Sequence, residues 1–309
     1  MVHIISSHES YIAEYKYIGD TCQQDRPKGV TGGVWVVVDG KPSLLEDFEG
    51  LEYTFMAETS DSEALEPRML AEVKRRPEWL QWEKAIEEEL ATLEAAETWV
   101  LEEPPPRANI IGSKWVFKAK KDAAGIIARL KARLVTQGFS QIGGVDYNDT
   151  YAPVAQLASS RAIISMANRL GLELHQVDIK GVYLNGELNE DEVLYMQFPP
   201  SYKPRDAGNR VLCLKKTLYG LKQSGRRWYQ KLSSIFESLG FQKCSVDQAV
   251  FHKSDKNKNE VTVVAVHVDD CTIAASNLRL IEEFKAGLRK HVEVTDLSEL
   301  HWMLGIEIK

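Results

Sequence analysis

The sequence predicts an α+β fold in which an antiparallel sheet is backed by helices on one face. Two observations carry this prediction. Residues 172–295 alternate between strand-like runs and amphipathic helical stretches. Within them, residues 263–275 form two apolar runs joined by a turn at Asp269 and Asp270, a pattern typical of a central hairpin. The 309 residues suffice for one large domain or two modest ones, with ample material for a core.

The first 65 residues are the least informative part of the chain. An apolar run at 34–38 is followed by the turn signal Asp39-Gly40, which predicts a strand and one hairpin. No residue pattern in this segment points to chemistry. We therefore interpret 1–65 as a connector and expect the functional domain to span 66–309.

Three amphipathic helices are expected in the longer segment. Pro77 suits the first position of a helix at 77–99, whose apolar residues recur at steps of three and four and form one stripe. We interpret this stripe as core, with a partner-binding surface as the alternative. The same spacing predicts helices at 223–239 and 277–290.

Positive charge is concentrated where the motifs of this sequence lie. The formal net charge is −7, but residues 44–103 alone hold 18 acids and 5 bases, so the remainder is net positive. Residues 114–133 carry seven bases and one acid, and residues 203–231 carry nine bases and one acid. The first run belongs to a predicted hairpin at 113–136 with its turn at 122–125. Such runs suit phosphate binding, although a solvated face has the same composition.

The cysteines and the hydropathy exclude some classes of protein. The four cysteines, Cys22, Cys213, Cys244 and Cys271, include no Cys-x-x-Cys pair and are typical of reduced intracellular thiols. No stretch approaches the roughly 20 apolar residues that cross a bilayer. The N-terminal residues lack the basic and apolar regions of a secretory signal. We therefore expect an intracellular protein that is neither secreted nor embedded in a membrane.

Acidic residues end two predicted strand segments. The segment 172–179 alternates like a half-buried strand and has Asp178 near its end, and the 263–275 hairpin has Asp269 and Asp270 at its tip. Carboxylates gathered beside a sheet are costly unless a cation binds them. These three could converge on two divalent ions about 3.5–4 Å apart. An Asp-Asp pair alone is also typical of a solvated turn.

Ten short motifs follow one another along residues 66–309. They are KWVFK at 114–118, RLKARLV at 129–135, QGF at 137–139, YAPV at 151–154, HQVDIK at 175–180, LNG at 184–186, LYGLKQ at 218–223, VDD at 268–270, DLSEL at 296–300 and LGI at 304–306. In this order they resemble the reverse transcriptase of copia-type retrotransposons. One such motif would be weak, but the ordered set is specific.

The resemblance implies an RNA-directed DNA polymerase with the fingers and palm of a right-hand polymerase. Such an enzyme transfers nucleotides from dNTPs to a primer 3′-hydroxyl on an RNA or DNA template, with two Mg²⁺ ions, or Mn²⁺ as an alternative, as cofactors. The family continues into a thumb and an RNase H region, which are lacking before Lys309. Further polyprotein segments or a partner chain are expected to supply them, in a cytoplasmic virus-like particle or in the nucleus.

Matching the motifs residue by residue gives each side chain an implied role. The catalytic, metal-binding acids would be Asp178, Asp269 and Asp270, of which the first two are the stronger candidates for direct ligands. The nucleotide would be bound by Arg129, Lys131, Arg133, Tyr183 and Lys222. Template and primer would contact Tyr219, Gly220, Arg226, Arg227, His267, Leu304 and Gly305. The sequence does not distinguish which of the first three bases reaches the triphosphate.

Some alternatives stay open at this point. Tyr183 would exclude a 2′-hydroxyl from the sugar site, although an aromatic residue just after a strand also suits core packing. His267 stands where the family usually carries Tyr, Gly225 where Pro is common, and Gly181 where a small hydroxyl or a larger residue is usual. None of these departures removes an expected metal ligand. The alternative function is an inactive or co-opted retroelement remnant that binds primer–template without extending it.

Overall fold

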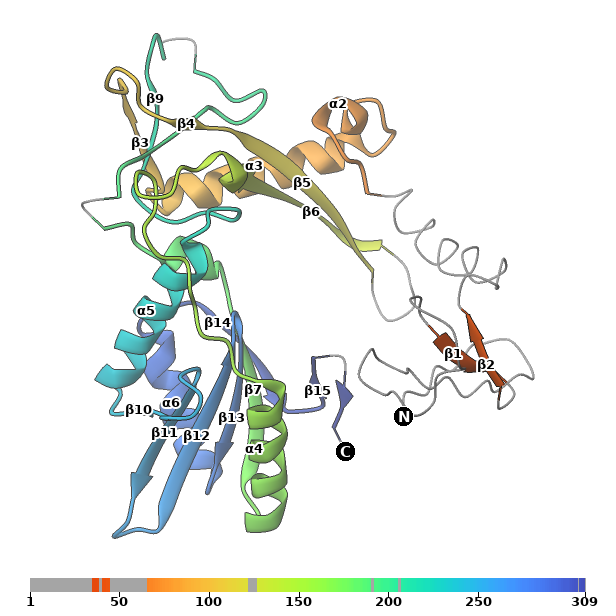
Figure 1. Cartoon of the computed structure of the whole chain (residues 1–309), viewed down its shortest axis with the longest axis vertical. Helices are drawn as coiled ribbons and strands as arrows, with labels where there is room; N and C mark the ends of the chain where they lie inside the picture. The colour runs from red at the N-terminus through yellow and green to blue at the C-terminus, as the bar shows by residue number, and fades with distance from the viewer. Residues whose placement is uncertain are drawn as a thin grey trace, which may run out of the picture. The chain divides into compact units, whose positions relative to one another are not determined.

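The structure is a computed structural model that describes most of the residues after position 65. It describes residues 66–121, 127–189, 192–204, 207–304 and 306–308, together with the backbone of 35–38 and 41–44. The chain divides into two compact units, Met1–Pro67 and Arg68–Lys309 (Figure 1). The turn predicted at 122–125 lies outside the described residues, as does most of the segment interpreted as a connector.

The first unit contains one described hairpin. Strand β1 (Trp35–Val38) pairs antiparallel with strand β2 (Lys41–Leu44). The apolar run predicted as a strand at 34–38 is therefore confirmed, and so is the hairpin after it.

A six-stranded sheet organises the second unit (Figure 1). The strands lie in the order β10-β11-β12-β13-β7-β14, and every neighbouring pair is antiparallel. Their bounds are β7 (Glu173–Ile179), β10 (Gln242–Lys243), β11 (Val250–Asp255), β12 (Glu260–His267), β13 (Asp270–Ala275) and β14 (Val294–Glu299). The predicted hairpin at 263–275 and the predicted strand at 172–179 are thus neighbours inside the sheet.

Helices cover both faces of this sheet, whereas the sequence predicted helices on one face only. The helices are α4 (Leu157–Leu170), α5 (Ser224–Ser238) and α6 (Leu278–Arg289). The last two pack on one face, where Phe236 and Phe284 join a core that includes Val264. Helix α4 packs on the other face, where Ile163 lies in a cluster with Ala265. Its buried residues include small ones such as Ser160 and Ala167, so its apolar stripe was too weak to predict.

The residues before 137, together with two strands from 194–214, form a second group of elements around the basic hairpin. Strands β5 (Ser113–Lys121) and β6 (Ile127–Thr136) pair antiparallel, as predicted. Helix α3 (Trp79–Ala95) packs along them, and its Trp82 meets Phe117 edge to face with ring centroids 5.2 Å apart. The remaining elements are α2 (Leu70–Val73) and a four-stranded sheet of β3 (Trp99–Glu102), β9 (Val211–Leu214), β8 (Leu194–Met196) and β4 (Ile110–Ile111).

The predicted helices are confirmed: α5 and α6 agree with the predicted bounds to within one residue at each end, and α3 to within two residues at its start and four at its end. Helix α3 begins after its N-cap Glu78, so Pro77 lies just before the helix and not at its first position. The Asn277 side chain caps α6 by accepting from the N–H of Leu280 at 3.2 Å. Three short pieces complete the unit: the 3₁₀ helices η2 (Gly138–Ser140) and η3 (Val182–Asn185), and the hairpin of β15 (Trp302–Met303) and β16 (Ile306–Glu307). Across the described residues, no helix has the length and apolar character needed to cross a membrane.

Candidate active site

Asp178 and Asp270 face each other across two neighbouring strands. Strands β7 and β13 are antiparallel, and their register pairs Asp178 directly with Asp270. The amide of Gln176 donates to Asp270 Oδ1 at 3.2 Å. Because side chains two residues apart on a strand share a face, this bond places both carboxylates on the face of Gln176. Directly opposed side chains have Cβ atoms about 4.5–5.5 Å apart, so the two acids are neighbours.

Asp269 lies in the two-residue turn that joins β12 to β13. The turn begins with Val268, whose φ of 61° is in the left-handed region that a β-branched residue rarely adopts. The indole N–H of the buried Trp228 donates to the Val268 carbonyl at 2.7 Å. The Asp269 carbonyl accepts from the N–H of Ile179 at 2.8 Å. These bonds hold the strained turn in place and bring Asp269 beside the end of β7.

The three carboxylates carry more negative charge than their neighbours neutralise. Lys180 Nζ lies 2.5 Å from Asp178 Oδ2, and in the described part of the chain it is the one lysine or arginine that forms an ion pair with any of the three. Burial raises the pKa of Asp270, and the charges of Asp269 and Asp178 raise it further against the hydrogen bond from Gln176. Burial and like charges both disfavour the ionised form of this carboxyl, so a bound cation would lower its energy.

The donor set suits a hard divalent cation. Mg²⁺ prefers carboxylate oxygens and is usually held by one or two of them together with water and phosphate oxygens. Within the residues that the structure describes, no group of three or more His, Cys, Asp or Glu side chains is arranged to hold an ion by itself. An ion held by so few carboxylates would complete its shell with water or with the phosphates of a ligand.

A row of side chains leads from the basic hairpin to the acidic turn. Arg133 on β6 lies over the ring of Tyr219, with its Cζ 4.9 Å from the ring centroid. Tyr219 meets Tyr183 of η3 edge to face, with ring centroids 4.8 Å apart. Burial raises the pKa of the Tyr183 hydroxyl, and the charge of Asp269 raises it further. The row thus joins a cation, two aromatic rings and a carboxylate.

Arg129 and Lys131, the other two hairpin bases expected to bind the nucleotide, lie beside helix α3. Arg129 pairs with Glu88 at 3.1 Å, and both side chains are exposed. Burial and the charge of Arg133 lower the pKa of Lys131, whereas Glu89 opposes that shift. Among the three bases that the sequence left equivalent, Arg133 is the one in contact with the row.

The backbone of Tyr219 and Gly220 passes directly against the end of β6. The N–H of Thr136 donates to the Tyr219 carbonyl at 2.8 Å. Gly220 has a φ of 94°, and a Cβ on it would lie 2.1 Å from the Thr136 carbonyl oxygen. A Cβ on Gly138 would lie 2.0 Å from the Gly220 carbonyl oxygen. Both positions require glycine because any side chain would push the two backbones apart.

Two buried glutamines fasten the segment after η2 to the start of α5. Gln141 Oε1 accepts from the N–H of Lys222 at 2.8 Å, and the Gln141 amide donates to Gln223 Oε1 at 3.0 Å. Gln223 donates to the Asp146 carbonyl at 2.9 Å. The Lys222 ammonium lies 5.2 Å from the ring centroid of Tyr147. Sequence reasoning missed the role of Gln141 because 82 positions separate it from Gln223 and no local pattern links them.

Two more residues around the acids escaped the sequence analysis. Gln176 could have been found, because it precedes Asp178 by two positions on an alternating strand and so shares its face. Trp228 was interpreted only as part of an apolar stripe. Its indole N–H needs a partner when the ring is buried, and the Val268 carbonyl supplies it.

Arg226 and Arg227 both have partners inside the protein. Arg226 pairs with Asp149 at 3.1 Å. Arg227 pairs with Glu192 at 2.7 Å, and these side chains are only 12% and 5% exposed. The two arginines line a small cleft of about 220 Å³. The buried pair favours a structural role for Arg227, since separating it would leave a charge buried without a partner.

The remaining expected primer contacts lie in two places. His267 Nε2 lies 3.1 Å from Ser160 Oγ on α4. Burial lowers the pKa of His267, and the charge of Asp270 opposes that shift. Leu304 lies between β15 and β16, where it is 53% exposed and has a φ of 50°. Gly305 lies outside the described residues.

An antiparallel sheet carries carboxylates at its strand ends, and a basic hairpin lies nearby, a combination typical of proteins that bind phosphate-bearing ligands through divalent cations. The sequence matches the family described as reverse transcriptase (RNA-dependent DNA polymerase) over residues 96–309. The chain belongs to this family, and the resemblance found in its motifs is confirmed.

Similar proteins come from retrotransposons of plants and yeast. The chain is 37% identical over 247 residues to the retrovirus-related Pol polyprotein from transposon TNT 1-94 of Nicotiana tabacum, covering 80% of this chain and 18% of that polyprotein. The corresponding polyprotein from transposon RE1 of Arabidopsis thaliana is 34% identical, covering 74% and 15%. The transposon Ty1-DR4 Gag-Pol polyprotein of Saccharomyces cerevisiae is 28% identical, covering 77% and 14%. The chain thus spans a small part of the length of these relatives.

Proposed function

We propose that this chain is the RNA-directed DNA polymerase domain of a copia-type retrotransposon polyprotein. It would add nucleotides from dNTPs to the 3′-hydroxyl of a primer annealed to an RNA or DNA template. The observation that carries the proposal is the in-register pair of Asp178 and Asp270 with Asp269 in the adjoining turn, in a member of the reverse transcriptase family.

The architecture supports a division into fingers and palm. The six-stranded sheet with α4, α5 and α6 would be the palm, because it carries the acids on strands braced by helices. The β5–β6 hairpin with α3 would be the fingers, because it brings basic residues to the same site. In this division residues 66–309 form the polymerase domain, and 1–65 remain a connector.

Asp178 and Asp269 would hold the metal ions, with Asp270 beside them. The backbone bond from Ile179 to the Asp269 carbonyl keeps the two ligand-bearing segments at one place. Two Mg²⁺ ions, or Mn²⁺ in their place, would supply the acidity that activates the 3′-hydroxyl and steadies the leaving pyrophosphate. Asp270 would add negative charge that strengthens cation binding, and a bound cation would offset the burial and the neighbouring carboxylates that raise its pKa.

The nucleotide would lie against the row of Arg133, Tyr219 and Tyr183. Arg133 would neutralise the triphosphate, because its guanidinium is planar and can donate two parallel hydrogen bonds to phosphate oxygens. Tyr183 would lie under the sugar and exclude a 2′-hydroxyl. Lys222 would approach from the start of α5, where Gln141 fixes its backbone. Arg129 and Lys131 would contribute long-range positive charge to the same site.

Primer and template would lie beside the acids, against the unit that carries the six-stranded sheet. Gly220 would act indirectly, by letting the Tyr219–Gly220 backbone pack against the end of β6. His267 and Leu304 would flank the primer terminus together with Gly305. Arg226 would meet template phosphates if it leaves Asp149, an exposed partner. Arg227 would act indirectly, by holding the start of α5. Such an element copies RNA inside the cell, in a cytoplasmic particle or in the nucleus, with the rest of its polyprotein.

Primer extension by the purified chain tests the proposal. An oligo(dT) primer on poly(rA), supplied with dTTP and Mg²⁺, should lengthen, and the Asp269→Asn variant should fail to extend it. Binding of the same primer–template is measured in parallel by fluorescence anisotropy. Binding without extension, in Mg²⁺ and in Mn²⁺, would favour the remnant that holds nucleic acid without copying it.

A further inference from the structure

Lys285 is the most deeply buried charged residue that the proposed chemistry does not use. It lies on α6 and is 1% exposed. Its ammonium has three partners: Asp296 Oδ1 at 2.8 Å, His175 Nδ1 at 2.9 Å and Glu282 Oε1 at 3.2 Å. An ammonium has three N–H donors and no acceptor, so all of its hydrogen bonds are accounted for. His175 must then offer the Nδ1 lone pair and carry its proton on Nε2.

The partners of Lys285 belong to three different elements. His175 lies on β7, Asp296 on β14 and Glu282 on α6 itself. In the sheet Thr295 pairs with Asp178, and Asp296 pairs with the residue before Asp178. The ammonium therefore sits at the point where β14 is in register with the strand that carries a proposed metal ligand.

Strand β14 becomes irregular immediately after this point. Its register against β7 shifts between Asp296 and Glu299, and Ser298 has a φ of 62°. Asp296 spans the irregularity, because its Oδ1 accepts from the N–H of Ser298 at 2.9 Å and its Oδ2 from Arg289 at 3.0 Å. Burial alone would raise the pKa of Asp296, but the hydrogen bonds from Lys285 and the Ser298 N–H hold it below its usual value.

We propose that Lys285 is a positioning residue that sets where the β15–β16 hairpin lies relative to Asp178. By tying Asp296 on β14 to His175 on β7, it links the two sides of the irregularity, because Asp296 precedes the register shift and His175 pairs with Glu299 after it, before the chain turns toward Leu304. The inference rests on the proposed function, in which this hairpin flanks the primer terminus. Lys285 would thus act on primer placement without touching primer, nucleotide or metal.

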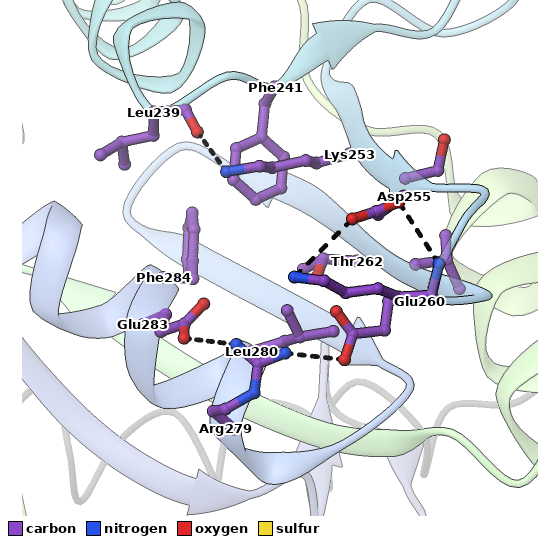
Figure 2. A pocket seen from close by; sticks show the side chains of 13 residues that line it. Leu239, Phe241, Lys253, Asp255, Glu260, Thr262, Arg279, Leu280, Glu283 and Phe284 are labelled. Atoms are coloured by element: carbon purple, nitrogen blue, oxygen red, sulfur yellow. Dashed lines mark hydrogen bonds and ion pairs between the residues drawn. The ribbon is translucent and has the colours of Figure 1, made fainter.

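Another cation on the same helix provides a matched control. Arg279 pairs with Glu260 of β12 at 2.7 Å and with Glu283 of α6 at 2.5 Å (Figure 2). Its side chain is 52% exposed, and its two partners lie on β12 and on α6, not on β14. Arg279→Met removes an α6 charge and two ion pairs, as Lys285→Met does, but leaves the β7–β14 junction intact.

The experiment compares Lys285→Met with Arg279→Met in the full chain. A double variant, Lys285→Met with Asp296→Asn, is included because it removes the carboxylate that the first change leaves short of a partner. Hydrogen–deuterium exchange reports the amides of 294–308, and steady-state extension reports KM for primer–template and kcat. We expect faster exchange confined to 294–308 and a KM for primer–template raised about tenfold, with kcat changed far less. Arg279→Met should change neither.

The two readouts separate the inference from the function it rests on. If the unaltered chain extends no primer, the proposed polymerase activity fails, and the exchange data still decide whether Lys285 holds the hairpin. Unchanged exchange at 294–308 in a folded Lys285 variant would overturn the inference. So would a uniform rise in exchange across the whole sheet, because that result indicates general stability and not positioning.

Discussion

The β12–β13 hairpin has two ends, and their charges are arranged in opposite ways. At the end with the β11–β12 turn, acids and bases match: Glu260 pairs with Arg279 at 2.7 Å, and Asp255 with Lys258 at 3.8 Å. These side chains line a pocket of about 270 Å³ (Figure 2). At the other end, Asp178, Asp269 and Asp270 share one lysine partner within the described residues.

The pKa shifts of the carboxyl groups differ in sign between the two ends, because a cation is in contact with one group and not with the other. The hydrogen bond from Arg279 lowers the pKa of Glu260 despite some opposing burial. Burial and Asp269 raise the pKa of Asp270. Carboxylates with matched cations are explained by the stability of the fold alone. A carboxylate left without them is destabilised by its own charge, and the positively charged ligand of the proposed function would relieve this.

Removing a carboxylate should therefore have very different effects at the two ends. Asp178→Asn and Asp269→Asn should each reduce primer extension by at least about a hundredfold, since charge stabilisation of the reacting groups is lost. Asp255→Asn, the matched change at the paired end, should leave extension within about twofold. Single-nucleotide addition is measured after circular dichroism confirms folding. Substantial activity in a folded Asp178 or Asp269 variant would contradict the assignment of the site.

A second comparison lies within the basic hairpin. Arg133→Met should raise the KM for dNTP about tenfold or more, because a charged hydrogen bond to phosphate is worth about 1.5–3 kcal/mol. Arg129→Met removes an identical side chain four residues earlier on the same strand. Arg129 pairs with Glu88, so its loss should change that KM little. Primer–template affinity is measured alongside. If both variants lose primer–template affinity equally while KM holds, the hairpin contacts the duplex and not the nucleotide.

A third test concerns the aromatic row. Tyr183→Ala should lower the preference for dNTP over rNTP about tenfold, because a steric block of the 2′-hydroxyl is removed. The readout is the ratio of kcat/KM values for dTTP and UTP. Tyr229→Ala, on α5 with its hydroxyl bonded to the Gln248 carbonyl, is a control for general loss of packing. An unchanged ratio in the first variant would make Tyr183 a core residue.

Patterns that repeat along the chain were predictable from sequence, and contacts across long separations were not. Helices α3, α5 and α6 and the strands around Asp178 and Asp269 follow from apolar periodicity and turn signals. The direct pairing of Asp178 with Asp270 needed the structure, because the 91 residues between them give no local sign of register. The distinction between Arg133 and Arg129 needed coordinates, since both lie on the same face of one strand.

The faces of the sheet show another limit of sequence reasoning. Helix α4 was missed because its buried side includes Ser160 and Ala167 instead of a row of large apolar residues. Small residues there let the helix approach the strands closely, and Ser160 meets His267. The hydrogen bond that anchors the strained Val268 also escaped prediction, because Trp228 counted only as an apolar residue.

Two carboxylates, the buried Asp247 and the half-buried Asp270, should affect stability in opposite directions. Burial alone would raise the pKa of Asp247, but hydrogen bonds from Ser159 and the N–H groups of Gln156 and Ala249 hold it below its usual value. Its stabilisation is present above the pKa of the unfolded chain and is lost as pH falls through the lower folded pKa. Asp247→Asn should cost about 1–3 kcal/mol at neutral pH.

Asp270 should behave in the reverse way because its folded pKa is raised. Between the unfolded and folded pKa values the native state binds more protons, so stability falls as pH rises through that window. Asp270→Asn should therefore stabilise the metal-free protein at neutral pH, and the gain should vanish below the unfolded pKa of about 3.9. Urea unfolding across a pH series measures both variants. Destabilisation by Asp270→Asn at neutral pH would show that the carboxylate already has adequate partners.

The smallest expected effect concerns the one cation at the acidic end. Lys180 is 50% exposed and its Nζ lies 2.5 Å from Asp178 Oδ2, so it competes with any metal ion for that oxygen. Lys180→Met keeps most of the side-chain stem and removes the competitor. Because an exposed ion pair is worth about 0.2–1 kcal/mol, the Mg²⁺ concentration for half-maximal extension should fall up to about fivefold.

Salt and a second lysine sharpen this last test. Added KCl should reduce the difference between the variant and the unaltered chain, because screening already weakens an exposed pair. Lys231→Met breaks a comparable exposed pair with Glu187, away from the acids, and should leave the Mg²⁺ dependence unchanged. A Lys180 variant that needs more Mg²⁺, or that raises the KM for dNTP, would instead place this ammonium on the substrate phosphates. Lys180 would then leave Asp178 in the complex, and the metal ions alone would balance the three carboxylates.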